Sequence, residues 1–144
     1  MMLRRVALLL PSLLLCFGCE PGAKVDECNM VVDTVSSGRE RIEAMVRHAL
    51  GAEGEAPAAL HRTAEVYGEL AGALGRLPLR DGELKGAVGE FRATLERLSR
   101  HGHEAAEAWS QADAKRAADA LAHFDRDELA VNDRVRVVNY VCQR

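Results

Sequence analysis

Residues 81–109, DGELKGAVGEFRATLERLSRHGHEAAEAW, decide the fold. Asp81 is a residue type that caps helix N-termini, and the apolar residues after it recur at steps of three and four. The recurring positions are Leu84, Val88, Phe91, Leu95, Leu98, Ala105 and Trp109, with Gly102 in the remaining place. This spacing predicts a long helix whose apolar face is buried from its first turn through Trp109.

The same spacing predicts three further helices, two before this one in the sequence and one after it. The first runs from Val25 to Ala49, the second from about Pro57 to Leu77, and the fourth from about Asp113 to Cys142. A glycine-containing break at 51–55 and a proline-containing break at 77–81 separate the first three. No segment alternates with a period of two for long, so we expect no strands.

Two of the apolar faces contain one charged residue each. The first face is Val25, Cys28, Val32, Val35, Ile42, Val46 and Ala49, and the fourth is Ala117, Leu121, Phe124, Val131, Val135, Val138 and Cys142. Arg39 occupies the vacant place in the first, and Glu128 occupies that in the fourth. One hypothesis pairs them inside the bundle or at its lip, and the alternative sends both side chains to solvent. Four consecutive charged residues at 125–128 leave the continuity of the fourth helix open.

Helices joined by short connections favour an all-α fold, an up-down-up-down antiparallel four-helix bundle over residues 24–144. In that topology the start of the first helix and the end of the last lie at the same end of the molecule. Cys28 and Cys142 are close to those two ends and lie on the apolar faces. We therefore predict a disulfide between them, with two free thiols as the alternative.

The N-terminal residues have a different composition. Arg4 and Arg5 precede an apolar run from Val6 to Phe17 that is too short to span a bilayer, as in secretory signal peptides. The Gly18-Cys19 pair that follows resembles the lipobox of bacterial lipoproteins, although Cys16 stands where that family usually has Leu. The resemblance implies cleavage between Gly18 and Cys19, diacylglycerol on Cys19 and acylation of the new amino terminus.

The lipoprotein resemblance divides the chain into three parts. Residues 1–18 are the signal peptide, residues 19–23 form a lipidated tether, and residues 24–144 form the bundle domain. Glu20, rather than Asp, follows the acceptor cysteine, and in many two-membrane bacteria this implies the outer membrane, facing the periplasm or the surface. A plainly secreted protein, without lipid, is the alternative.

Charge excludes one class of partner. Removing Arg4 and Arg5 with the signal leaves 17 basic residues against 22 acidic residues, a formal charge of −5. Such a chain has no electrostatic attraction for nucleic acid or for anionic head groups. Attachment to a membrane must therefore come from acyl chains, each buried methylene of which contributes about 0.8 kcal/mol.

Motifs for chemistry are missing from the sequence. His101 and His103 are two residues apart and cannot chelate one ion together on a helix, and no Glu-x-x-His occurs. No Gly-x-Ser-x-Gly, phosphate loop or HExxH occurs either, so we expect neither an enzyme nor a metal site. A bundle can hold haem between Met and His on different helices, and Met30 or Met45 with His123 are the candidates.

The two ends of the predicted bundle carry a second resemblance. Glu27-Cys28-Asn29 and Val138-Asn139-Tyr140-Val141-Cys142, with the connection from Leu77 to Leu84, are similar to small exported all-helical bacterial proteins. In those proteins the terminal helices share a disulfide, and many are lipoproteins. We expect an envelope lipoprotein whose bundle is a structural or protein-interaction module with an envelope protein as partner; the alternative is a soluble exported bundle that binds a small ligand or haem.

Overall fold

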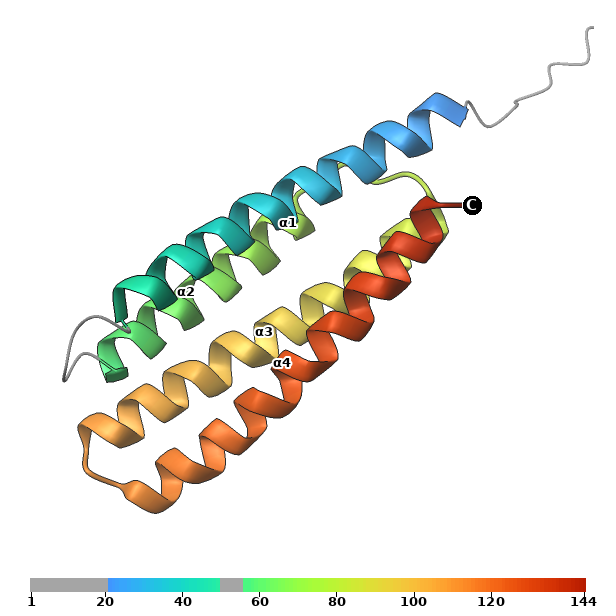
Figure 1. Ribbon diagram of the computed structural model, residues 1–144. Coiled ribbons are helices and arrows are strands. Elements are labelled where there is room, and N and C mark those ends of the chain that lie inside the picture. The colour runs from blue at the N-terminus through green and yellow to red at the C-terminus, as the bar shows by residue number, and fades with distance from the viewer. Residues whose placement is uncertain (1–20, 50–55) are drawn as a thin grey trace, which may run out of the picture.

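The computed structural model describes residues 21–49 and 56–144, which form four helices and no strand. They are α1 (Pro21–Ala49), α2 (Ala56–Gly75), α3 (Gly82–Ser110) and α4 (Ala114–Cys142). Consecutive helices run antiparallel, and α1 starts at the end of the molecule where the chain finishes (Figure 1). The predicted all-α four-helix bundle is confirmed. Within the described ranges, no helix is long and apolar enough to cross a membrane.

Helix α3 is the centre of the bundle. It packs along its length against α2 on one side and α4 on the other. Its apolar face supplies the largest fully buried side chains, among them Leu84, Phe91, Leu95 and Leu98. The stretch that predicted the fold therefore forms the middle of the core.

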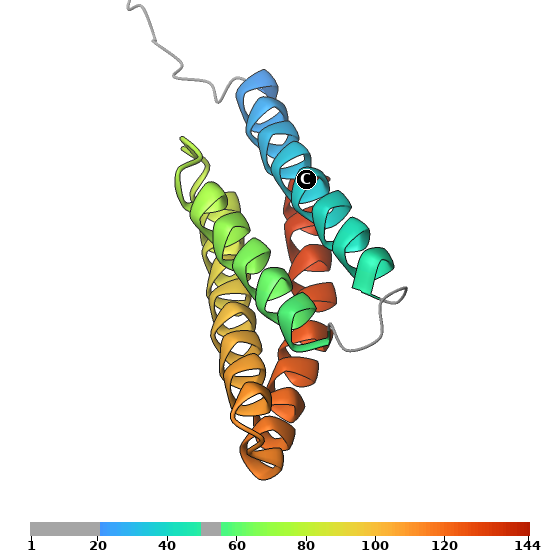
Figure 2. The same cartoon turned by 90° about the vertical axis from the view of Figure 1, so that its left-hand side faces the viewer.

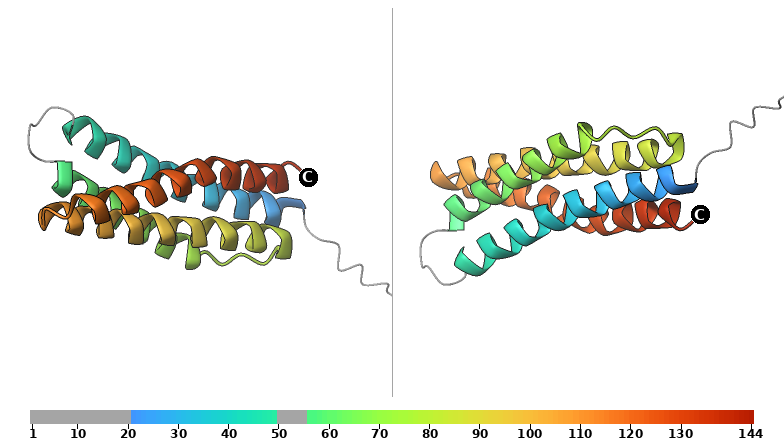
Figure 3. Two further views of the ribbon diagram at one scale, coloured as in Figure 1. Left: turned by 90° about the horizontal axis from the view of Figure 1, so that it is seen from below. Right: turned by 90° about the horizontal axis from the view of Figure 1, so that it is seen from above.

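Helix α1 has fewer contacts with the rest of the bundle than the other three helices have. It packs against α2 and approaches α4 only over a short length. The start of α1 and the end of α4 are adjacent, and the two helices diverge toward the opposite end of the bundle (Figures 2 and 3). Val31, Val35, Val135 and Val138 line a groove of about 180 Å³ between them, with Phe91 of α3 also in its wall.

Val25 of the first predicted face is exposed, and at four other places the buried face differs from the prediction by one residue. In each case the structure takes a step of three where the predicted face took a step of four. The buried residues are Val31, Gly38, Ala108 and Asp127, in place of Val32, Arg39, Trp109 and Glu128, which are exposed. Steps of three and of four both return to nearly the same side of a helix, so packing against the neighbouring helices selects the earlier position.

Trp109 is the largest of these corrections. Its side chain was expected in the core, but it is 48% exposed, whereas Ala108 beside it is fully buried. Trp109 instead borders a shallow recess with Ala117 and Leu121 of α4, near the α3–α4 turn.

The helix boundaries refine the predicted ones. Helix α1 begins at Pro21, so residues 21–23 of the expected tether are helical; proline suits a first turn because its missing N–H has no helical acceptor there. Helix α2 ends at Gly75, two residues before Leu77. Helix α4 is continuous through 125–128, which settles the question left by its four charged residues.

The α3–α4 connection is a tight turn built on two caps. The N–H of Asp113 donates to the carbonyl of Ala108 at 2.9 Å, and that of Ala112 donates to Trp109 at 3.0 Å. This is the Schellman motif, and it places Ala112 in the left-handed region at φ 58°. The Asp113 carboxylate also accepts from the N–H of Arg116, so Asp113 ends one helix and caps the next.

Candidate functional site

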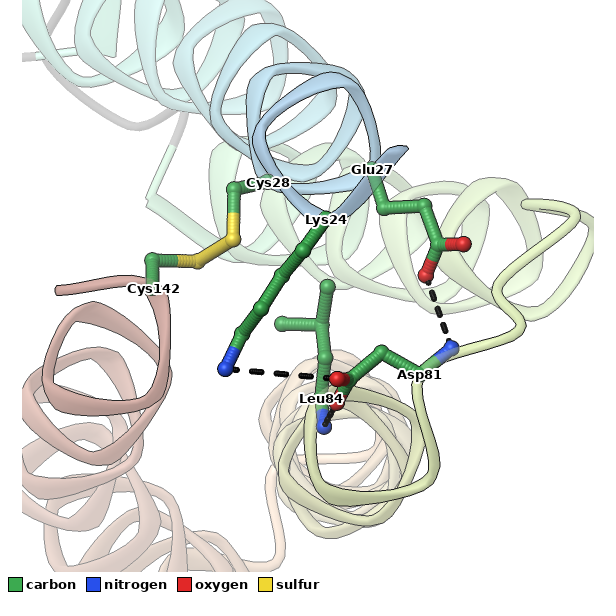
Figure 4. The surroundings of a disulfide bond; sticks show 6 residues. All are labelled: Lys24, Glu27, Cys28, Asp81, Leu84 and Cys142. Carbon is green, nitrogen blue, oxygen red and sulfur yellow. Dashed lines mark hydrogen bonds and ion pairs between the residues drawn. A yellow bond between two sulfur atoms is a disulfide. The ribbon is translucent and has the colours of Figure 1, made fainter. Parts of the chain in front are cut away.

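The start of α1 is joined covalently to the end of α4. Cys28 and Cys142 form a disulfide with their Cα atoms 5.8 Å apart, within the usual range for this bond. Cys28 is buried, and the bond links positions 114 residues apart in the sequence (Figure 4). The predicted disulfide is confirmed.

A buried carboxylate reinforces the same end of the bundle. Glu27, only 6% exposed, accepts hydrogen bonds at Oε2 from the backbone N–H groups of Arg80 at 3.0 Å and Asp81 at 3.1 Å. Asp81 in turn caps α3 by accepting from the N–H of Leu84 at 2.8 Å (Figure 4). A buried carboxylate needs such donors. Glu27 therefore provides the hydrogen-bond acceptor for two N–H groups of the α2–α3 connection and fixes α1 against that connection.

Two ion pairs, one half-buried and one exposed, surround the clamp formed by the Cys28–Cys142 disulfide and Glu27. Lys24 Nζ lies 3.9 Å from Asp81 Oδ2, and Arg144 Nη1 lies 3.3 Å from Glu83 Oε1. Arg144 also stands over the ring of Tyr140 at 5.4 Å from its centroid. The Lys24–Asp81 pair is long, and the exposed Arg144–Glu83 pair contributes only about 0–1 kcal/mol, so the disulfide and Glu27 are the main supports of this end.

The predicted lipid site precedes this clamp directly in the sequence. Gly18 and Cys19, the predicted cleavage and acylation residues, lie outside the described residues. Helix α1 starts at Pro21, two positions after Cys19, and reaches Cys28 nine positions after it. Whatever Cys19 carries is therefore connected to the disulfide end through little more than the first turns of α1.

A second polar cluster lies in the middle of the α3–α4 interface. The largely buried carboxylate of Asp127 accepts from Arg97 Nε at 3.0 Å and lies 2.9 Å from His101 Nδ1. The Arg97 guanidinium also donates to the hydroxyl of Thr94 at 3.1 Å. These contacts fix the register of α4 against α3, because a shift of either helix would leave a buried charge without its partners.

The predicted pair of Arg39 with Glu128 is not formed. Arg39 Nε contacts Glu43 Oε1 at 2.6 Å on its own helix, and this contact raises the pKa of Arg39. Glu128 is exposed on α4. The cause is the divergence of α1 from α4, which separates the two helices at this height and leaves both side chains in solvent.

The charge of Glu128 affects Tyr67 of α2 instead of Arg39 of α1. Burial of Tyr67, helped by the negative charge of Glu128, raises the pKa of the Tyr67 phenol to about 12. The Tyr67 ring also packs against Phe124 with the centroids 6.0 Å apart.

The sequence analysis did not predict the buried position of Asp127, because it assigned the charged place on the α4 face to Glu128. The one available signal was that Asp127 lies a step of three after Phe124.

Histidines pair between helices rather than along α3. The rings of His101 and His123 lie 5.2 Å apart between centroids, and those of His61 and His103 lie 4.5 Å apart. His101 and His103 thus face different neighbours, as their spacing predicted. Among the residues that the structure describes, no group of three or more His, Cys, Asp or Glu is placed to hold a metal ion.

The candidate haem ligands are not brought together. Met45 borders a recess between α1 and α2 with Arg41 and Arg62, whereas His123 faces His101. Met30 lies two residues after Cys28 and His123 nineteen before Cys142, so their heights along the bundle differ by about 25 Å. Met30 is therefore too far along the bundle to share an axial pair with His123, and Met45 borders α2 instead.

No protein-family model matches the chain, and the comparisons with curated proteins and with solved structures return no match.

Proposed function

We propose that this chain is an envelope lipoprotein, anchored in the outer membrane through acylated Cys19, whose bundle is a structural or protein-interaction module. The observation that carries the proposal is the Cys28–Cys142 disulfide. Disulfides persist in oxidising compartments and are rare in the cytosol, so the bond supports export. The basic and apolar leader that ends at Gly18-Cys19 supports the same route.

The position of the bond supports a tether at this end. The disulfide and Glu27 hold the start of α1 to α4 and to the α2–α3 connection. A pull on the anchor would therefore be shared between three elements instead of acting on α1 alone. That sharing matters because α1 has the least contact with the rest of the bundle.

Acyl chains are the proposed means of attachment. One acyl chain binds a membrane only marginally, whereas two or three chains on Cys19 hold it firmly, at about 0.8 kcal/mol for each buried methylene. Exposed apolar side chains near the anchored end, Val137 of α4 and Val32 of α1, give a neighbouring envelope protein something to contact.

The test compares two cysteines of the same leader region. The full chain is expressed in its host with a palmitate analogue, as wild type, Cys19→Ser and Cys16→Ser. Label and membrane association should disappear in Cys19→Ser and persist in Cys16→Ser, and the intact mass should show loss of residues 1–18 with added acyl mass. Wild-type protein without label, or label that Cys19→Ser retains, would refute the anchor.

A further inference from the structure

The contact of His101 with Asp127 determines where the imidazole proton lies. His101 Nδ1 is 2.9 Å from Asp127 Oδ2, and an ionised carboxylate can only accept a hydrogen bond. Nδ1 must therefore carry the proton, which leaves the lone pair of the neutral ring on Nε2. Histidines that bind metal ions through one ring nitrogen usually donate the N–H of the other nitrogen to a carboxylate, and His101 has this arrangement.

The carboxylate itself is fixed in place. Asp127 is largely buried, and its other oxygen accepts from Arg97 Nε at 3.0 Å. Arg97 is held in turn by the hydroxyl of Thr94. The orientation of the His101 ring is therefore set by a chain of contacts that runs from α4 back to α3.

His123 adds a second imidazole at the same place. It lies one turn before Asp127 on α4, and its exposed ring faces that of His101 at 5.2 Å between centroids, tilted by 32°. Its Nδ1 is 3.5 Å from Arg126 Nη1, so Nε2 is the nitrogen left for a ligand. Two imidazoles that bind one tetrahedral zinc ion at about 2.0–2.1 Å have ring centroids roughly 5 Å apart, as this pair does.

We propose that His101 and His123 together bind one divalent transition-metal ion, such as zinc, through their Nε2 atoms, with Asp127 as the positioning residue behind His101. Imidazole nitrogen is a preferred ligand of such ions. The described part of the chain offers no third His, Cys, Asp or Glu to the same ion. Water fills the remaining positions, and the ion is exchangeable. This site is independent of the membrane anchor.

The second histidine pair supplies the matched control. His61 and His103 are also close, at 4.5 Å between ring centroids, but neither ring has a buried carboxylate behind it; Glu65, whose Oε1 lies 3.7 Å from His61 Nδ1, is exposed. If any two neighbouring histidines sufficed, both pairs would bind equally. Removal of His61 should then weaken binding as much as removal of His123.

The experiment measures zinc affinity on the full chain purified in detergent and freed of metal with a chelator. Zinc chloride is titrated in competition with a chromogenic chelator, and cobalt(II) absorption reports the geometry. We expect one zinc ion per chain, at least tenfold weaker binding in His123→Gln and unchanged binding in His61→Gln. Equal affinity in wild type and His123→Gln, or a loss confined to His61→Gln, would overturn the proposal.

The role of Asp127 needs its own variant. Asp127→Asn keeps the shape of the side chain but removes the charge that holds the His101 proton, so zinc should bind about 10–100-fold more weakly and the cobalt spectrum should change. Circular dichroism establishes that the variant is folded. His123 is exposed, so His123→Gln tests the site even where Asp127→Asn unfolds. Unchanged affinity in folded Asp127→Asn would refute the positioning role.

Discussion

At Gly102, α3 closely approaches both α2 and α4. A Cβ added there would stand 2.8 Å from the Cβ of Ala64 on α2 and 3.2 Å from the ring of Phe124 on α4. The Ala64 Cβ is attached directly to a backbone and cannot swing away. Gly102 therefore permits the close helix spacing, at a local cost in helix propensity of about 1 kcal/mol.

Two glycine substitutions in α3 should have opposite effects. Gly102→Ala should lower the free energy of unfolding by about 1–3 kcal/mol because the added methyl overpacks the interface. Gly89→Ala should raise it by up to about 1 kcal/mol, since Gly89 is exposed and nothing lies within 4 Å of its added Cβ. Urea denaturation measures both. A Gly102→Ala variant with a higher free energy of unfolding would contradict this account, because the helices would then accommodate the added methyl group without losing packing energy.

Tyr67 should make stability depend on alkaline pH. Below pH 10 the phenol is protonated in both folded and unfolded chains and has no effect. Between pH 10 and about 12 the unfolded chain loses this proton while the folded chain keeps it, so the free energy of unfolding falls as pH rises. The loss is on the order of 2–3 kcal/mol for a pKa raised from its usual value near 10 to about 12.

Denaturation at a series of pH values tests this dependence. Tyr67→Phe should remove the alkaline loss, and Tyr140→Phe, at an exposed position, should retain it. Absorbance of the tyrosinate in Tyr140→Phe reports the Tyr67 pKa directly. A phenol that titrates near pH 10 in that variant would contradict the burial assigned to it.

At the scale of elements, the turns and interfaces of α3 position its neighbours. At one end, Asp81 caps α3 while Glu27 of α1 holds the backbone just before it. At the other end, the Schellman motif passes the chain into α4 within three residues. Between them, Arg97 and Asp127 determine which turn of α4 faces which turn of α3.

The α3–α4 turn carries a residue that is not optimal for it. Ala112 adopts φ 58°, which costs an L-residue with a Cβ about 1–2 kcal/mol. Ala112→Gly should therefore raise the free energy of unfolding by roughly 1 kcal/mol, the residual after glycine's larger chain entropy. Ala118→Gly, on the exposed face of α4, should lower it by about 1 kcal/mol. Thermal denaturation distinguishes the two signs.

At the scale of the whole molecule, the disulfide closes the fourth side of the bundle. The interfaces of α3 with α2 and α4 are long, whereas α1 meets α4 only near the bond. A cross-link of this kind acts mainly by restricting the unfolded chain, and its effect grows with the length of the closed loop. The separation of 114 residues is close to the full length of the bundle.

Removal of the bond should therefore weaken the protein and release α1 first. The Cys28→Ala, Cys142→Ala double variant should lose up to about 4.7 kcal/mol of unfolding free energy. Amide hydrogen exchange should rise in α1 before α3 or α4. Wild type treated with a reductant is the matched comparison and should behave alike. Equal stability of oxidised and reduced protein would contradict this account.

The sequence by itself determined the number of helices, their order and which cysteines meet. These follow from the three–four spacing of apolar residues and from short connections, both of which are local properties. Asp81 was recognisable as a cap from its residue type and from the apolar spacing after it, and the structure confirms it.

Only the tertiary structure decided which of two adjacent residues faces the core. A step of three or of four keeps the same period, so the sequence could not choose between Asp127 and Glu128, or between Gly38 and Arg39. The choice depends on the neighbouring helices: Arg97 and His101 stand opposite Asp127, and Leu70 stands opposite Gly38. Packing between helices selects the buried residue of each pair, because only contacts with another helix can stabilise a close approach at Gly38 or supply partners for the buried charge of Asp127.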